Sequence, residues 1–251
     1  MTTERPPLLF VHGAWHASWC WDEHFTGHFA DLGYEVHTVD LRGHRRDAGP
    51  ARLGWHSVAD YVADVREAVA AIGRPPVIVA HSMGGFVLQK YLEADDCAGA
   101  VLVASVPPRG VLGVVLGLAK ARPRDLLRSL TTFDLYPIVA GPEHTRAMFY
   151  SAAVPETEII NYSAALGNES YRAFLDMMVL KLPRTKRIRG KVPMLVLGGE
   201  LDRVFPPAVV RATGAAYGTE PVLFTGMAHN LMLDVGWEDV AATISGWLSD
   251  R

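Results

Sequence analysis

The sequence predicts an α/β fold in which a mainly parallel sheet of about six strands is flanked by helices on both faces. Short runs of consecutive apolar residues, such as 8–11 and 77–80, are typical of strands that are buried on both faces. Segments whose apolar residues recur with helical spacing separate these runs. The polar motifs described below directly follow the runs, at the carboxyl ends of the strands, where open parallel sheets bind their ligands.

The first part of the chain alternates strand, helix and strand. Residues 8–11 form the first predicted strand, residues 21–32 a helix that ends at Gly33, and residues 34–39 the second strand. Ser57 is a candidate N-cap for the next helix. The apolar face of that helix consists of Val58, Tyr61, Val62, Val65, Val69 and Ile72.

The same alternation returns in the last part of the chain. Residues 99–104, 193–197 and 222–225 are predicted strands, and residues 237–249 a closing helix. Between them, residues 107–191 contain only helical pieces without a strong strand pattern, interrupted by Pro123, Pro137, Pro142, Pro155 and Pro183. We call residues 107–191 the lid segment, and we predict that it is a helical insertion into a core formed by residues 1–106 and 192–251.

Composition fits one globular domain with an insertion. Of 251 residues, 49% are hydrophobic and 20% are charged, which is enough material for a large core. The first seven residues lack the apolar stretch of a secretory signal, and no apolar run approaches the roughly 18 residues of a membrane span. Two cysteines, Cys20 and Cys97, are too few for a disulfide framework. We therefore expect a cytoplasmic protein without a transmembrane segment.

Charge is distributed unevenly along the chain. The net charge is −3, but the lid segment holds 13 Lys or Arg against 7 Asp or Glu. Neither a nucleic-acid-binding motif nor a set of interleaved aromatic residues accompanies these charges, so we expect no nucleic acid partner. Residues 181–191 hold six Lys or Arg and no acid. A solvated hinge is the default interpretation of this run, and attraction of anionic substrates or of an anionic lipid surface is the alternative.

Ser82 is the candidate nucleophile. It stands where the apolar strand 77–80 gives way to a helix over about residues 83–94, and small residues flank it at Ala80, Gly84 and Gly85. So abrupt a reversal leaves little room for side chains and exposes the serine. The pattern resembles the nucleophile elbow of α/β-hydrolases, with Ala80 in place of the commoner first glycine. A serine that merely caps the helix is the alternative.

A serine hydroxyl needs a base to accept its proton and a carboxylate to orient that base. In the fold that the elbow resembles, the chain order is serine, acid, histidine, which leaves His144, inside the lid segment, and His229, after the last strand. We predict that His229 is the base. Asp202, which follows the strand at 193–197, is the predicted acid, and Glu200 is its competitor.

A carbonyl under attack develops negative charge that backbone N–H groups stabilise. We expect one N–H from Met83, at the start of the helix after Ser82, and another from Ala14, since Gly13 allows the chain to turn after the first strand. A zinc site at His12 and His16 is a weak alternative because no third ligand accompanies them. We expect no metal and no cofactor, and a supporting role for His12.

Five motifs together resemble the α/β-hydrolase superfamily, and they extend over nearly the whole chain. They are residues 12–15 (His-Gly-Ala-Trp), 40–44 (Asp-Leu-Arg-Gly-His), 80–84 (Ala-His-Ser-Met-Gly), 199–202 (Gly-Glu-Leu-Asp) and 226–229 (Gly-Met-Ala-His). Only seven residues precede the first strand, so the two leading antiparallel strands of the superfamily are expected to be missing or vestigial. The first motif, together with Trp19-Cys20-Trp21, is similar to the branch of plant methyl esterases, hydroxynitrile lyases and related bacterial esterases.

The resemblance implies hydrolysis of a carboxylic ester by a Ser-His-Asp triad through an acyl-enzyme. The lyases of this branch place threonine and lysine where this chain has Gly13 and Asn230, so ester hydrolysis is favoured, and carbon–carbon lyase chemistry is the alternative within the branch. A receptor that retains a triad is an alternative of another class. A substrate pocket that includes Trp15, Phe86 and the lid residues Met148 and Phe149 would take a hydrophobic or lipid-like small-molecule ester.

Overall fold

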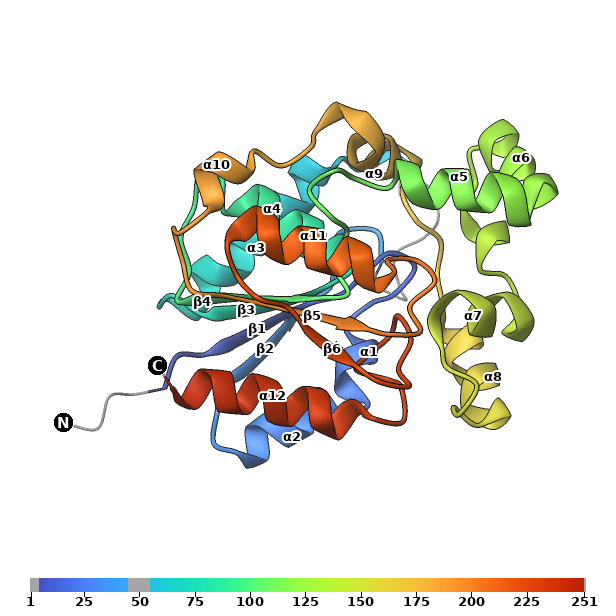
Figure 1. Cartoon of the computed structure of the whole chain (residues 1–251). Helices are drawn as coiled ribbons and strands as arrows, with labels where there is room; N and C mark the ends of the chain where they lie inside the picture. The colour runs from blue at the N-terminus through green and yellow to red at the C-terminus, as the bar shows by residue number, and fades with distance from the viewer. Residues whose placement is uncertain (1–4, 45–54, 251) are drawn as a thin grey trace.

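The computed structural model describes residues 5–44 and 55–250, and its centre is one parallel sheet (Figure 1). The strand order is β2-β1-β3-β4-β5-β6, and each neighbouring pair is parallel. The predicted mainly parallel sheet of about six strands is therefore confirmed. The strands are β1 (Leu8–Val11), β2 (Val36–Val39), β3 (Val77–His81), β4 (Gly99–Val103), β5 (Met194–Gly199) and β6 (Val222–Phe224).

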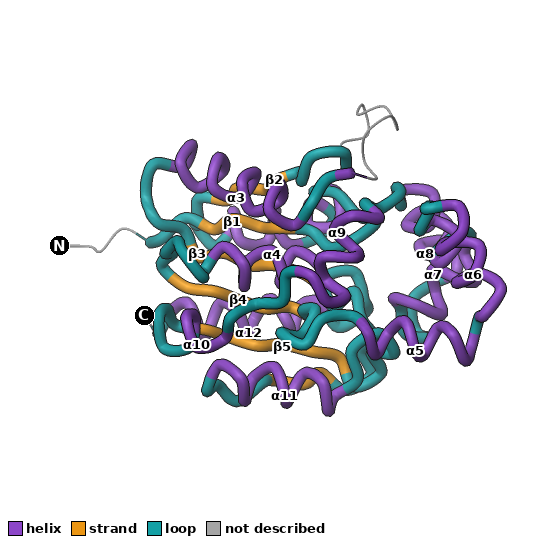
Figure 2. Tube along the Cα trace, turned by 90° about the horizontal axis from the view of Figure 1, so that it is seen from above, coloured by secondary structure: helices purple, strands orange, loops and turns teal. Residues whose placement is uncertain are grey.

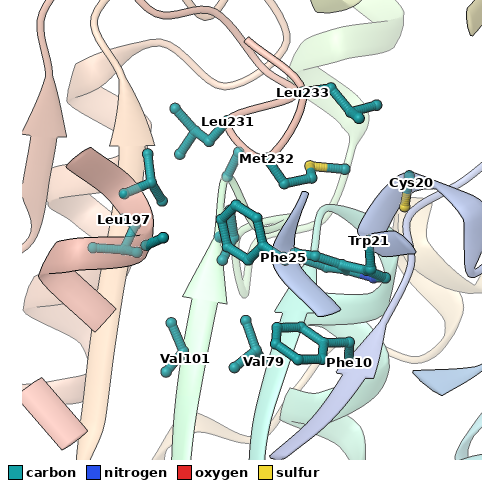
Figure 3. Close-up of a cluster of buried hydrophobic side chains, with 14 of the residues drawn as sticks. Phe10, Cys20, Trp21, Phe25, Val79, Val101, Leu197, Leu231, Met232 and Leu233 are labelled. Carbon is teal, nitrogen blue, oxygen red and sulfur yellow. The ribbon is translucent and has the colours of Figure 1, made fainter. Parts of the chain in front are cut away.

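Helices cover both faces of the sheet (Figure 1). One face carries α1 (Trp19–Asp22), α2 (Phe25–Asp31) and α12 (Trp237–Ser249). The other carries α3 (Val58–Ile72), α4 (Met83–Tyr91) and α11 (Pro207–Tyr217). Successive side chains of a strand point to opposite faces, so each strand contributes to two apolar layers. In one layer, Phe10, Val79, Val101 and Leu197 meet Trp21 and Phe25 (Figure 3).

Several predicted elements differ in their bounds from those in the structure, and for two of them the contacts give the reason. The predicted helix at 21–32 is two helices, α1 and α2, because the backbone of His24 leaves helical values at φ −136° and its ring stacks on Trp237 at 4.6 Å. The second strand begins at Val36 rather than at residue 34, because pairing with β1 starts at Leu8↔Val36. By contrast, Ser57 caps α3 as predicted and accepts a hydrogen bond from the Asp60 N–H.

The lid segment contains helices joined by loops, and no strand. Figures 1 and 2 place α5 to α8 beyond the carboxyl ends of the strands, whereas α9 and α10 lie over the layer of α3 and α4. Ala173, Met177 and Ile188 are accordingly buried in the same apolar cluster as residues of α3, α4 and α11. The helices are α5 (Leu112–Ala121), α6 (Pro123–Thr132), η2 (Tyr136–Ile138), α7 (Pro142–Phe149), α8 (Glu156–Ala165), α9 (Tyr171–Leu175), η3 (Asp176–Leu180) and α10 (Thr185–Ile188).

None of the helices within residues 5–44 and 55–250 combines the length and the apolar composition that crossing a bilayer requires. The cytoplasmic location stays a prediction. Residues 1–4, on which the expectation of no signal sequence partly rested, lie outside the described residues.

A buried ion pair joins the lid segment to the core. The Glu169 carboxylate lies 2.9 Å from Nε2 of His44, which follows β2, and the side chains of both residues are 1% exposed. Glu169 also accepts hydrogen bonds from the Tyr61 hydroxyl at 3.0 Å and from the Trp15 N–H at 3.4 Å. Burial by itself would lower the pKa of His44, but the charge and the hydrogen bond of Glu169 hold that pKa above its ordinary value.

Helix α4 begins directly against the end of β1, and Gly84 permits this approach. A Cβ atom at Gly84 would lie 2.4 Å from the carbonyl oxygen of His12 and 2.7 Å from that of Val11. Both neighbours are backbone atoms, so neither can move aside without a large cost in free energy.

We expect Gly84→Ala to lower the free energy of unfolding by about 3 kcal/mol or more, since overpacking against backbone is costly. Gly117→Ala is the matched control, because no heavy atom lies within 4 Å of the Cβ position inside α5. The control should raise the free energy of unfolding by about 0.5–1 kcal/mol, as alanine does inside a helix. Urea unfolding measures both values. Equal stability of Gly84→Ala and the wild type would contradict the close approach of α4 to β1.

The His44–Glu169 pair should give a pH-dependent contribution to stability. Since the folded state raises the pKa of His44, the contribution is fully present below the unfolded pKa of about 6.5 and is lost as pH rises through the folded value. His44→Gln should therefore cost about 3–5 kcal/mol at low pH and clearly less at pH 9. Urea unfolding of the wild type and of His44→Gln, from low pH to pH 9, measures the difference between their free energies of unfolding.

His37→Gln is the control for this comparison, because His37 pairs with Glu35 at 2.7 Å on the exposed surface. Surface pairs contribute only about 0–1 kcal/mol, so its cost should be small. A cost of His44→Gln that stays constant or grows toward pH 9 would contradict the assignment of a charged His44.

Candidate active site

Ser82 occupies a strained turn between β3 and α4. Its backbone angles are φ 50° and ψ −115°, which a residue with a side chain rarely adopts, and the strain marks a position held by its surroundings. The Ser82 N–H donates to the carbonyl of Val103, and its carbonyl accepts from the Val106 N–H. Gly85 is required nearby, because a Cβ there would lie 2.2 Å from Oγ of Ser105.

The three residues that the sequence predicted as a triad lie in one hydrogen-bonded chain. Nε2 of His229 is 3.0 Å from Oγ of Ser82, and Nδ1 of His229 is 2.8 Å from Oδ2 of Asp202. With its proton on Nδ1, the imidazole donates to Asp202 and accepts from the Ser82 hydroxyl. Glu200, the competing acid, is exposed, and His144 lies on α7 within the lid segment.

Backbone groups hold Asp202 in this orientation. Its Oδ1 accepts from the N–H groups of Val204 at 2.7 Å and Phe205 at 2.9 Å, which leaves Oδ2 for His229. Asp202 is 3% exposed and His229 is 1% exposed, so bulk water competes little for their hydrogen bond.

The loop that carries His229 is fixed from two sides. The N–H groups of His229 and Asn230 both donate to the carbonyl of Phe149, at 3.1 and 2.9 Å, and the Phe149 ring stacks on the imidazole. On the other side, buried Asp234 accepts from the N–H groups of Ala228 and Ser151 and from the Ser151 hydroxyl. The lid segment thus supports the position of His229 directly.

Three further histidines, His12, His16 and His81, surround the hydrogen-bonded side chains of Ser82, His229 and Asp202. Burial keeps these three histidines neutral. Burial lowers the pKa of His16 to about 4. Burial also lowers the pKa of His12, with a contribution from nearby His44, and the pKa of His81, with a contribution from His229. His81 donates from Nε2 to the carbonyl of His229 at 3.2 Å.

His12 orients the peptide unit that links Gly13 to Ala14. Its Nδ1–H donates to the Gly13 carbonyl at 2.8 Å, and its Nε2 accepts from the Leu41 N–H at 3.1 Å. Both ring nitrogens of His12 are occupied, so none is left to bind a zinc ion. The expected supporting role of His12 fits these contacts.

A narrow cavity of about 60 Å³ lies over Ser82, and Ala14 and Met83 line it as well. Met83 is the first residue of α4, where backbone N–H groups have no partner within the helix. The other lining residues are almost all apolar. They are Trp15, Val106, Val111, Val114, Val115, Leu118, Leu126, Leu135, Ile138, Met148, Glu169, Phe174, Met177, Val204 and Phe205.

Two of the four predicted pocket residues lie elsewhere. Trp15 and Met148 line the cavity, but Phe86 is fully buried in the apolar layer of α3 and α4, because it belongs to the inward face of α4. Phe149 contacts the ring of His229 rather than the cavity. A wider groove of about 580 Å³ adjoins the cavity and shares Val114, Leu118, Met148, Val204 and Phe205 with it.

Sequence reasoning missed several polar residues that support the site. Glu169 lines the cavity and accepts a hydrogen bond from the Trp15 N–H. Asp234 accepts a hydrogen bond from the Ala228 N–H in the loop that carries His229. Asn230 is fully buried, and its amide donates to His16 and to the Tyr150 hydroxyl at 3.0 Å each. No local pattern marks these residues, because each has at least one partner that is distant in the chain. The only signal was the position of Asn230 and Asp234 close behind a predicted catalytic histidine.

The chain matches the alpha/beta hydrolase family over residues 8–243. Norfluorocurarine synthase 2 of Strychnos sp. is 33% identical over 111 residues, which are 42% of this chain and 41% of that protein. Probable esterase PIR7A of Oryza sativa is 33% identical over 164 residues, 59% of this chain and 61% of that protein. Methyl jasmonate esterase 1 of Vitis vinifera is 27% identical over 163 residues, with the same two shares. The chain thus spans 41% to 61% of the length of these relatives.

Solved structures share the fold over almost the whole chain. Methylesterase MES16 from Arabidopsis aligns with a TM-score of 0.72 and 19% identity over 98% of this chain and 100% of that chain. A bromoperoxidase from Bacillus anthracis aligns with a TM-score of 0.75 and 19% identity over 98% and 92%. The family match confirms the predicted superfamily, and the esterases among the relatives agree with the predicted esterase branch: the chain belongs to the alpha/beta hydrolase family.

Proposed function

We propose that the protein is a serine hydrolase that cleaves carboxylic esters through an acyl-enzyme on Ser82. The observation that carries this proposal is the position of His229, 3.0 Å from the Ser82 hydroxyl and 2.8 Å from Asp202. Esterases among the relatives that this chain resembles support the reaction class.

In the proposed reaction, Oγ of Ser82 attacks the ester carbonyl carbon while its proton passes to Nε2 of His229. The carbonyl oxygen becomes an oxyanion, which the N–H groups of Ala14 and Met83 would stabilise. Breakage of the bond between carbon and the alcohol oxygen expels the alcohol, which takes the proton from His229. Water, which gives a proton to His229, then attacks the carbonyl carbon of the acyl group. The bond from that carbon to Oγ of Ser82 breaks, Oγ takes the proton back from His229, and the carboxylic acid leaves.

The groups around the site suit these steps. A hydrogen bond to His12 holds the Gly13 carbonyl on the side away from the cavity. The N–H of Ala14 belongs to the same trans peptide unit, so it points in the opposite direction, toward the cavity. The imidazolium that forms on His229 lies beside the Asp202 carboxylate, whereas His16 and His81 stay neutral and add no opposing charge.

The proposed substrate is an ester with a hydrophobic acyl or aryl group. Among the described residues, Glu169 is the only acid that lines the cavity, and its oxygens already accept four hydrogen bonds, from Trp15, His44, Tyr61 and Ser170. The remaining lining offers mainly aliphatic and aromatic contacts, which favour an apolar substrate group over a polar one.

Labelling with a fluorophosphonate tests the nucleophile. Wild-type protein should react and lose activity toward p-nitrophenyl esters, whereas Ser82→Ala should not be labelled and should lose about 10³-fold or more in kcat. Ser105→Ala is the control, because Ser105 is buried beside the elbow but hydrogen-bonds to Gln89 and Val106 rather than to a histidine. It should be labelled like wild type. Undiminished labelling of Ser82→Ala would reject the proposal.

A further inference from the structure

Large exposed apolar side chains are concentrated on the lid segment. Of the 13 among the described residues, eight fall within residues 112–133 and 179–182, and the other five are scattered along the chain. Isolated exposed apolar residues are ordinary on protein surfaces, but a concentration of them indicates a binding surface. We call the exposed apolar residues of α5, α6 and the turn after α6 the outer lid surface: Leu112, Leu116, Leu127, Leu130 and Phe133.

Helix α5 is apolar on two sides. No residue of α5 is fully buried, and Lys120 is its only charged residue. Val114, Val115 and Leu118 line the cavity over Ser82, while Leu112 and Leu116 are 46% and 58% exposed. Helix α5 therefore lies between the cavity over Ser82 and the surroundings of the protein.

The η3 turn continues this exposed region. Gly110, two residues before α5, packs so closely on η3 and the residues after it that a Cβ there would lie 2.0 Å from the Met177 carbonyl oxygen and 2.8 Å from Leu182. Val179 and Leu180 of η3 are 58% and 55% exposed. Apolar side chains thus extend from α6 across α5 to the segment that leads into α10.

Basic residues accompany this surface. Residues 107–133 hold five Lys or Arg and one acid, Asp125, which pairs with Arg122 at 2.8 Å. Within the described parts of the chain, no ion pair joins Lys120, Arg124 or Arg128 to an acid. The surface is therefore both apolar and strongly positive.

We propose that the outer lid surface binds peripherally to an anionic lipid surface, with its leucines among the acyl chains and its Lys and Arg at the headgroups. Exposed leucines beside unpaired cations are the composition of helices that lie in a membrane interface. A second copy of the chain is a poorer occupant, because face-to-face pairing would bring the cations of two outer lid surfaces together. The proposal does not depend on the chemistry of Ser82.

Cosedimentation with vesicles tests this proposal, with Ser82→Ala protein as the parent so that binding is measured without turnover. The parent should bind vesicles of phosphatidylcholine and phosphatidylglycerol, three to one, at least tenfold more tightly than vesicles of phosphatidylcholine alone. Adding Leu116→Ser and Leu127→Ser should weaken binding about tenfold or more. Adding Arg124→Gln and Arg128→Gln should also weaken binding and reduce its salt dependence.

The matched control replaces exposed apolar residues elsewhere. Leu32→Ser with Val235→Ser, at 42% and 52% exposure, should leave vesicle binding unchanged. Circular dichroism verifies that each variant is folded. Absence of binding by the folded parent, or equal loss in the control pair, would overturn the proposal. Light scattering without vesicles tests whether a second copy of the chain occupies this surface instead. A dimer that Leu116→Ser dissociates would assign the outer lid surface to a second copy and would also overturn the proposal.

Discussion

The hydrogen bond between His229 and Asp202 is the interaction on which the arrangement of the site depends. It fixes the imidazole with its proton on Nδ1 and directs Nε2 at the Ser82 hydroxyl. Hydrogen bonds from other residues hold both partners in place. The N–H groups of Val204 and Phe205 orient Asp202, and the Phe149 carbonyl anchors the backbone of His229. The core supplies the first restraint and the lid segment the second.

The same division recurs at the other side of the cavity. His12, at the end of β1, orients the peptide unit between Gly13 and Ala14, while Glu169 of the lid segment receives the Trp15 N–H. Glu169 is buried with His44, and removing either charge would leave the other without compensation. The lid segment is thus bonded to the loops that follow β1 and β2, and its buried contacts form part of the site that it covers.

Much of this could be predicted from the sequence because parallel strands end at a common edge. Ser82, Asp202 and His229 each follow an apolar run, and that placement alone brings them together. Other features required tertiary contacts. Phe86 is an aromatic residue close behind the nucleophile, but it lies on the side of α4 that faces the core. Glu169 is bonded to His44, Tyr61 and Trp15, which are more than 100 residues away in the chain.

The central claim is that Asp202 orients His229 to activate Ser82, and the kinetics of two variants test it most directly. Asp202→Asn should lower kcat for an ester by about 10⁴-fold, because the amide favours the wrong imidazole tautomer. Glu200→Gln, two residues away and exposed, should stay close to wild type. A large loss in Glu200→Gln together with near-normal turnover by Asp202→Asn would contradict the account.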